Sequence, residues 1–152
     1  MDFTLNEDQK LFQETARRFA QQELPDLARE LEQRDDSVGE DWMRRYAEMG
    51  FFGINVPEQY GGQGMGHLEA VLVLEELAKV SSAVAMPVFE GNFGPMAVLV
   101  YFAPEELRRR VLPQVCAGKL MIAVSMSEPD AGTALTDLNT RAEVRGDRGI
   151  VN

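Results

Sequence analysis

The fold is decided by the stretch from Asn6 to Leu31, which reads NEDQKLFQETARRFAQQELPDLAREL. Asn6 followed by Gln9 has the form of a capping box, which marks the start of a helix. Pro25 is expected to kink or split this helix, because proline has no backbone N–H to donate. Apolar residues recur at spacings of three and four, which predicts one buried face: Phe12, Ala16, Phe19, Ala20, Leu24, Leu27 and Leu31.

Four more helices are expected downstream of this first one. A short helix through Trp42 and Tyr46 should end at Gly50, because glycine readily adopts the left-handed conformation of a helix end. The segment 68–80 is apolar nearly all round, which is typical of a helix buried on most sides. Two further helices are expected after Gly94-Pro95 and between Pro104 and Gly118.

The pattern changes toward strand character after residue 120. The run 121–126 is apolar, and apolar and charged residues alternate from Thr140 to Arg145. Gly146 to Gly149 has the composition of a hairpin turn. We therefore predict a mainly α fold: an all-α helical domain over residues 1–118, followed by the first strands of a truncated β domain over residues 119–152.

Composition excludes several classes of partner. The chain has 152 residues and a formal net charge of −10, which disfavours nucleic acid and anionic membrane surfaces because both reward clustered Lys and Arg. The longest apolar run, 96–103, is shorter than the roughly 20 residues of a membrane-spanning helix, so no membrane span is expected. The start, 1–8, is acidic and does not have the form of an export signal. With one cysteine and one histidine, neither an internal disulfide nor a metal site rich in these residues is expected, and a cytoplasmic location fits best.

Some single residues and short motifs invite a chemical role but have simpler explanations. The glycine-rich segment 61–66 matches neither a P-loop nor G-x-G-x-x-G, so it is interpreted as a turn between helices. His67 stands at a helix start without a neighbouring nucleophile or acid. Cys116 lies in the last turn of a helix, where it is expected to be packing material. Arg108, Arg109 and Arg110 point in different directions around a helix and do not form one patch.

The segment from Val124 to Thr133, which reads VSMSEPDAGT, is the candidate binding loop. Strand ends fix positions, Ser127 and Thr133 offer hydroxyl groups, and Gly132 allows a ligand to approach the backbone closely. An ordinary surface turn of the same composition remains the alternative.

This loop resembles a motif of the acyl-CoA dehydrogenase family. Ser127-Glu128-Pro129-Asp130-Ala131-Gly132-Thr133 is similar to the family loop Thr-Glu-Pro-Gly-Ala-Gly-Ser. Three other stretches support the resemblance, in the same order along the chain: 3–9 (FTLNEDQ), 56–62 (VPEQYGG), and 112–113 (LP) with 117–118 (AG). Together they extend over essentially the whole chain.

The resemblance implies a cofactor, a substrate and a set of site residues. In the family, FAD and an acyl-CoA thioester meet between an N-terminal helical domain, a middle β domain and a C-terminal helical domain. The catalytic base is a glutamate of the C-terminal domain, so we nominate no catalytic residue and expect this fragment to be inactive alone. The implied cofactor contacts are Val124, Met126, Ser127, Gly132 and Thr133. The implied substrate contacts are Thr133 and, at the floor of the acyl pocket, Glu90, Gly91 and Phe93, with Phe93 as a steric gauge.

The resemblance also implies partners, and two departures from the motif keep alternatives open. An electron-transferring flavoprotein or a similar acceptor would take the electrons, and the full-length protein would be a homo-oligomer; no metal is implied. Asp130 stands where the family commonly has glycine, and Ala134 stands where an aspartate usually follows the serine. The alternatives are a non-catalytic helical assembly or binding module that retains the fold, and an acyl-CoA oxidase.

Overall fold

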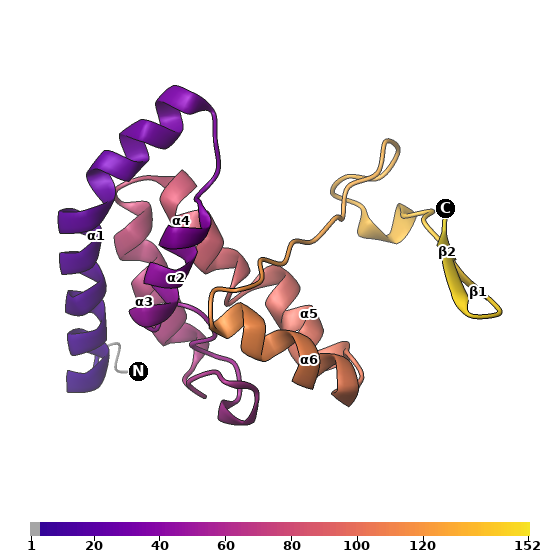
Figure 1. Cartoon of the computed structure of the whole chain (residues 1–152), viewed down its shortest axis with the longest axis horizontal. Coiled ribbons are helices and arrows are strands. Elements are labelled where there is room, and N and C mark those ends of the chain that lie inside the picture. The colour runs from indigo at the N-terminus through magenta and orange to yellow at the C-terminus, as the bar shows by residue number, and fades with distance from the viewer. Residues whose placement is uncertain (1–3) are drawn as a thin grey trace.

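The computed structural model describes residues 4–152 and is mainly α, as predicted, with one small sheet (Figure 1). Residues 1–3 lie outside the described residues; they belong to the acidic start, and Phe3 also opens the first family stretch. The helices are α1 (Glu7–Arg34), α2 (Glu40–Glu48), α3 (His67–Ala78), α4 (Ser82–Glu90), α5 (Gly94–Phe102) and α6 (Glu105–Cys116). Short 3-10 turns are η1 (Glu58–Tyr60) and η2 (Leu135–Asp137), and the strands are β1 (Ala142–Arg145) and β2 (Arg148–Val151).

Helix α1 begins as the sequence predicts. The Gln9 N–H donates to Asn6 Oδ1 at 2.8 Å, and the Asn6 N–H donates to Gln9 Oε1 at 3.0 Å, so the capping box is complete. The helix continues through Pro25, and its axis changes direction in its later half (Figure 1). The predicted apolar stripe is buried except for Phe12, which packs at the edge of the core.

The core consists of two clusters of buried side chains. The larger one joins α1 to α2, α3 and α4 around an aromatic centre, where the Phe19 ring lies 5.3 Å from that of Phe51 and 5.9 Å from that of Tyr46. Edge-to-face pairs of this kind are favourable beyond the area they bury. The smaller cluster lies between η1, α5 and α6 and contains Val56, Tyr60, Met96, Leu112 and Val115.

Helix α4 was not among the predicted helices. It begins where Ser81 Oγ accepts the Ala83 N–H at 3.2 Å, and it contains Pro87. Its sequence, SAVAMPVFE, is almost wholly apolar, so buried residues such as Val88 and exposed residues such as Met86 do not contrast in polarity. Without that contrast, no helical periodicity can be read from the sequence.

The sequence also predicts that no apolar segment is long enough to span a membrane. This prediction needs a correction at one segment. By length and composition alone, Ser82–Phe102 could cross a membrane. The structure divides this segment into α4 and α5, and 44% of its apolar 18-residue window is buried inside the fold. Buried core helices commonly have this composition.

After residues 120–124, which line a groove with α5 and α6, the chain runs away from the helices (Figure 1). The prediction of a strand at 121–126 is wrong. This segment is irregular, because none of the described residues pairs with its backbone as a neighbouring strand. The hairpin is confirmed, with Ala142 opposite Val151 and Arg145 opposite Arg148 in an antiparallel register. Gly146 adopts the left-handed conformation, with φ of 66°, that its two-residue turn requires.

Candidate functional site

Of the predicted pocket-floor residues, Glu90 is the last residue of α4, and Gly91 and Phe93 lie in the turn before α5. Phe93 precedes α5, and its ring stacks on that of Phe89 at a centroid distance of 5.7 Å. The His67 ring, from the first residue of α3, lies 6.1 Å from the Phe93 ring. His67 is therefore at a helix start, as predicted, and it also packs against a predicted site residue. The Phe93 ring therefore packs against two aromatic neighbours.

Asn92 anchors this turn, although it was not singled out in the sequence. Its side chain is buried, with an exposed fraction of 1%. Its Oδ1 accepts the Ile54 N–H at 2.7 Å, and its Nδ2 donates to the carbonyls of Phe51 at 2.8 Å and Val88 at 2.7 Å. A polar residue between Gly91 and Phe93 in an apolar stretch is a signal for such a role, because buried amides must be hydrogen bonded.

Two residues before Asn92 have constrained surroundings: packing restricts Gly91, and a helix end favours the charge of Glu90. The Gly53 N–H donates to the Gly91 carbonyl at 3.1 Å, and a Cβ at Gly91 would lie 2.5 Å from Cδ1 of Phe52, so only glycine fits without rearrangement. Glu90 Oε2 is buried and has no hydrogen-bond partner among the described residues. It lies beside the first turn of α5, 3.8 Å from where a Cβ on Gly94 would be. The positive end of that helix favours a carboxylate at this place.

The candidate binding loop 127–133 is braced by Glu128. Its backbone exchanges two hydrogen bonds with Ala131, at 2.9 and 3.1 Å. Its carboxylate accepts the N–H groups of Asn139 at 2.7 Å and Thr140 at 2.8 Å, and these bonds lower the pKa of the Glu128 carboxyl below its usual value. The loop is therefore tied to the residues that lead into β1. Sequence reasoning missed this role, because the partners lie 11 and 12 positions away.

The predicted cofactor contacts are all exposed on this braced loop and the segment before it: Val124, Met126, Ser127, Gly132 and Thr133. A Cβ at Gly132 would meet nothing within 4 Å, and its φ is not in the left-handed region. Neither packing nor backbone conformation within residues 4–152 therefore requires glycine at this position. Within residues 4–152, neither the Ser127 hydroxyl nor the Thr133 hydroxyl forms a hydrogen bond.

Residues 6–119 match the family described as acyl-CoA dehydrogenase, N-terminal domain. The chain belongs to the acyl-CoA dehydrogenase family. The mitochondrial isovaleryl-CoA dehydrogenase of Bos taurus is 35% identical over 150 residues, which cover 97% of this chain. The chain spans 35% of the length of that relative.

Two further relatives extend the comparison. A 3-sulfinopropanoyl-CoA desulfinase from Cupriavidus necator is 36% identical over 103 residues, which cover 68% of this chain and 26% of the relative. The solved structure of a glutaryl-coenzyme A dehydrogenase with glutaryl-CoA superimposes with a TM-score of 0.91 at 28% identity, covering 100% of this chain and 39% of the other. The acyl-CoA dehydrogenase fold thus accounts for the hairpin as well as for the helices.

The two groups of predicted site residues lie on different parts of the chain. Val124 lines an apolar groove with Pro95 and Val98 of α5 and Val111 of α6, so the segment before the loop lies along the helices. Beyond Val124 the chain leaves them (Figure 1). Within residues 4–152, no hydrogen bond or ring contact joins the loop 127–133 to the turn 90–93. Helix α5 is the link, because it begins at the pocket-floor turn and its side forms the groove.

Proposed function

We propose that this chain is the N-terminal part of an FAD-dependent acyl-CoA dehydrogenase that introduces an α,β double bond into an acyl-CoA thioester. Residues 1–118 would form its helical domain, and residues 119–152 would begin its middle β domain. The observation that carries the proposal is the loop 127–133, which is braced by the hydrogen bonds of Glu128. Within residues 4–152, the two hydroxyls of this loop form no hydrogen bond, and a Cβ on Gly132 would contact nothing. Membership of the family supports the same conclusion.

The loop fits a flat cofactor. Ser127 would donate a hydrogen bond to the isoalloxazine, while Val124 and Met126 would provide backbone and packing contacts along the ring. Gly132 would let the backbone approach the ligand closely, which explains a glycine that the chain itself does not need. Thr133 would contact both the cofactor and the CoA portion. When bound, FAD supplies the hydride acceptor of the reaction.

The turn between α4 and α5 fits the end of an acyl chain. Phe93 would limit chain length by its bulk, since its ring packs against those of Phe89 and His67. Gly91 would keep the floor close to the Phe52 ring, and Glu90 would border it. These residues orient the substrate and exclude water. The catalytic base would come from outside residues 1–152, so the isolated chain is expected to be inactive.

The remaining parts of the proposal concern the whole protein. Its electrons would pass to an electron-transferring flavoprotein or a similar acceptor, and it would form a homo-oligomer in the cytoplasm. An acidic surface suits an encounter with a protein acceptor more than with nucleic acid, because the net charge is −10.

A second reaction class is favoured by one comparison. The relative from Cupriavidus necator is named a desulfinase, so a chain 36% identical to this one belongs to a protein with a different reaction on a CoA thioester. Product analysis separates the candidates. A dehydrogenase yields the enoyl-CoA, a desulfinase releases sulfite from a sulfinated acyl-CoA, and an oxidase forms hydrogen peroxide in air.

The first test is whether the full-length protein binds flavin and is reduced by acyl-CoA. We expect a yellow protein whose visible flavin absorption bleaches when saturated acyl-CoA is added without oxygen. A full-length protein that stays colourless after incubation with FAD would favour the non-catalytic helical module instead.

Matched serine variants test the residue that carries the proposal. Ser127→Ala should weaken FAD retention about fivefold, since a hydrogen bond to a bound ligand contributes on the order of 1 kcal/mol. Ser125→Ala removes the same group two residues earlier and should leave retention unchanged. Equal retention by both variants would contradict the assignment of Ser127.

A further inference from the structure

Asn92 lies between two residues proposed to border the acyl chain but cannot touch a ligand itself, because its side chain is 1% exposed. Its amide has one allowed orientation. The oxygen faces an N–H donor of Ile54, and the nitrogen faces the carbonyls of Phe51 and Val88. Reversing the amide would place like groups against each other at all three contacts. Asn92 is therefore locked in place.

The hydrogen bonds that this turn makes outside α4 and α5 all lead to one segment, residues 51–55. Besides the side-chain bonds of Asn92, its carbonyl accepts the Asn55 Nδ2 at 2.9 Å, and the Gly91 carbonyl accepts the Gly53 N–H at 3.1 Å. Residues 51–54 are buried, with Phe51 and Phe52 in the larger core cluster. The turn is thus attached to a buried segment of the core and not only to its own helices.

We infer that Asn92 is a positioning residue for acyl-chain selectivity: it fixes Phe93 and Glu90 by tying the turn between α4 and α5 to residues 51–55. This inference rests on the proposed function. The wall of an acyl pocket can select substrates by chain length only while it stays in place. One methylene group of the substrate in a well-packed pocket changes kcat/KM by about 10- to 200-fold. A displacement of about 1 Å relaxes such a limit. Asn92 therefore acts on selectivity through Phe93.

The experiment measures kcat/KM for a series of straight-chain acyl-CoA substrates in the full-length holoenzyme. The readout is the ratio between the best substrate and the one two carbons longer. Asn92→Ser keeps a small polar group and leaves room for water, and it should lower this ratio at least about fivefold while flavin content is kept. Asn55→Ala removes only the bond to the Asn92 carbonyl and should lower the ratio less. Because Asn55 is half-buried, this variant carries the test if Asn92→Ser fails to fold.

Tyr46→Phe is the matched control. The Tyr46 hydroxyl donates to the Val84 carbonyl at 2.9 Å, so this variant also removes a buried hydrogen bond to α4, at a place away from the turn. It should lower thermal stability without changing the selectivity ratio. If Asn92→Ser lowers stability and leaves the ratio as Tyr46→Phe does, Asn92 has a structural role only and the inference is overturned.

A double-variant cycle tests the route of the effect. Phe93→Ala alone should extend the accepted chain length, and Asn92→Ser should add nothing in that background, since the residue it positions is gone. An undiminished effect of Asn92→Ser on Phe93→Ala would overturn positioning through Phe93. A wild-type protein that binds no flavin would overturn the proposed function. An active enzyme whose selectivity ratio is unchanged in all variants would overturn this inference alone.

Discussion

The surroundings of Cys116, at the end of α6, exclude a reactive role for its thiol. Its side chain packs on Gly53, where any Cβ would overlap Cys116 Sγ, and Gly53 is also in the left-handed conformation with φ of 63°. Burial raises the pKa of the Cys116 thiol to about 11. Since the thiolate is the reactive form, this thiol is a packing group, as its place in the sequence predicts.

The prediction at this residue concerns alkylation. At pH 8 the native thiol should react with iodoacetamide at least ~100-fold more slowly than free cysteine, because its thiolate fraction is smaller by about that factor. The reaction should accelerate as pH rises toward 11. The same chain in urea serves as the control and should react at the rate of an unfolded thiol. Fast labelling of the native chain at pH 8 would show that Sγ is accessible and ionised.

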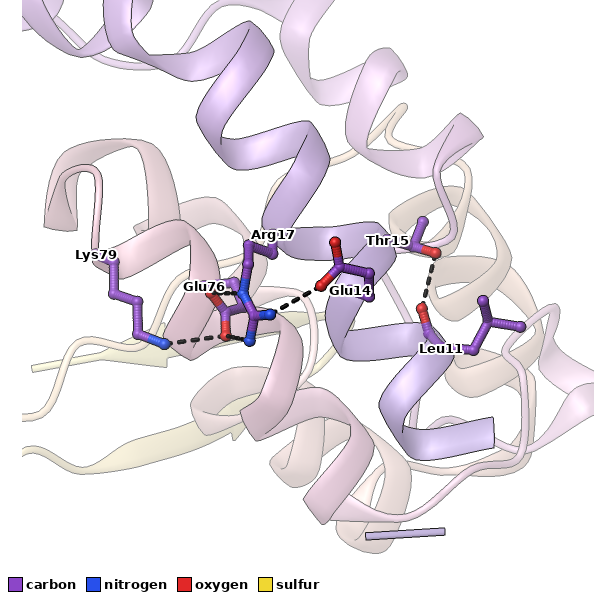
Figure 2. A network of polar contacts seen from close by, with 6 residues as sticks. All are labelled: Leu11, Glu14, Thr15, Arg17, Glu76 and Lys79. Atoms are coloured by element: carbon purple, nitrogen blue, oxygen red, sulfur yellow. Dashed lines mark hydrogen bonds and ion pairs between the residues drawn. The ribbon is translucent and has the colours of Figure 1, made fainter. Parts of the chain in front are cut away.

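At the scale of elements, α1 and α3 are joined by a charged network (Figure 2). The Glu76 carboxylate of α3, with its side chain 2% exposed, accepts Arg17 Nη2 of α1 at 3.1 Å and Lys79 Nζ at 2.9 Å. Arg17 also bonds Glu14 within α1, at 2.8 Å. Burial alone would raise the pKa of Glu76, but the bonds from Arg17 and Lys79 outweigh it, so the pKa is lowered.

Removing Arg17 should therefore destabilise the pair of helices. We expect Arg17→Met to lower the free energy of unfolding at pH 7 by about 1–2 kcal/mol, because a buried carboxylate loses its inter-helix partner while Lys79 remains. Urea titration followed by the fluorescence of Trp42, which packs against the core, measures this. Arg18→Met is the control: it removes an exposed charge for which no ion pair occurs among the described residues, and it should change stability by less than about 0.5 kcal/mol.

The pH dependence of this network follows from the lowered pKa of Glu76. A carboxyl whose pKa is lower in the folded chain adds stability above its unfolded pKa, near 4.3, and loses it as pH falls through the folded value. Glu76→Gln should therefore be less stable than the wild type at pH 7, and the difference should shrink below about pH 4. A difference that is constant from pH 7 to pH 3 would show that hydrogen bonding without charge holds Glu76.

These elements also mark what the sequence could predict. The capping box and apolar stripe of α1 were readable because its buried and exposed faces differ in polarity. Helix α4 was not, since both its faces are apolar, and 121–126 was misread because an apolar run forms a strand only beside a partner strand. The loop 127–133 was found from its motif, but the bracing by Glu128 and the anchoring by Asn92 depend on long-range bonds that no local pattern encodes.

At the scale of the whole molecule, stability is distributed unequally along the chain. Residues 4–118 contain both core clusters, whereas Ala131 is the one buried hydrophobic residue between 119 and 152. Val144 of β1 is 85% exposed, and the hairpin packs on no helix (Figure 1). A two-stranded hairpin alone is at best marginally stable in water. The hairpin and the candidate binding loop should therefore open locally while the helices remain folded.

Amide hydrogen exchange tests this division. In the 152-residue chain, amides of β1 and β2 should exchange through local opening, with protection below about 100-fold, whereas amides of buried α1 residues such as Ala20 and Leu24 should be protected about 1,000-fold or more. Because the exposed strand edges can pair between copies, exchange must be measured at two protein concentrations. Protection of the hairpin that is as strong as that of α1 and independent of concentration would show that residues 119–152 are stabilised by the helices after all.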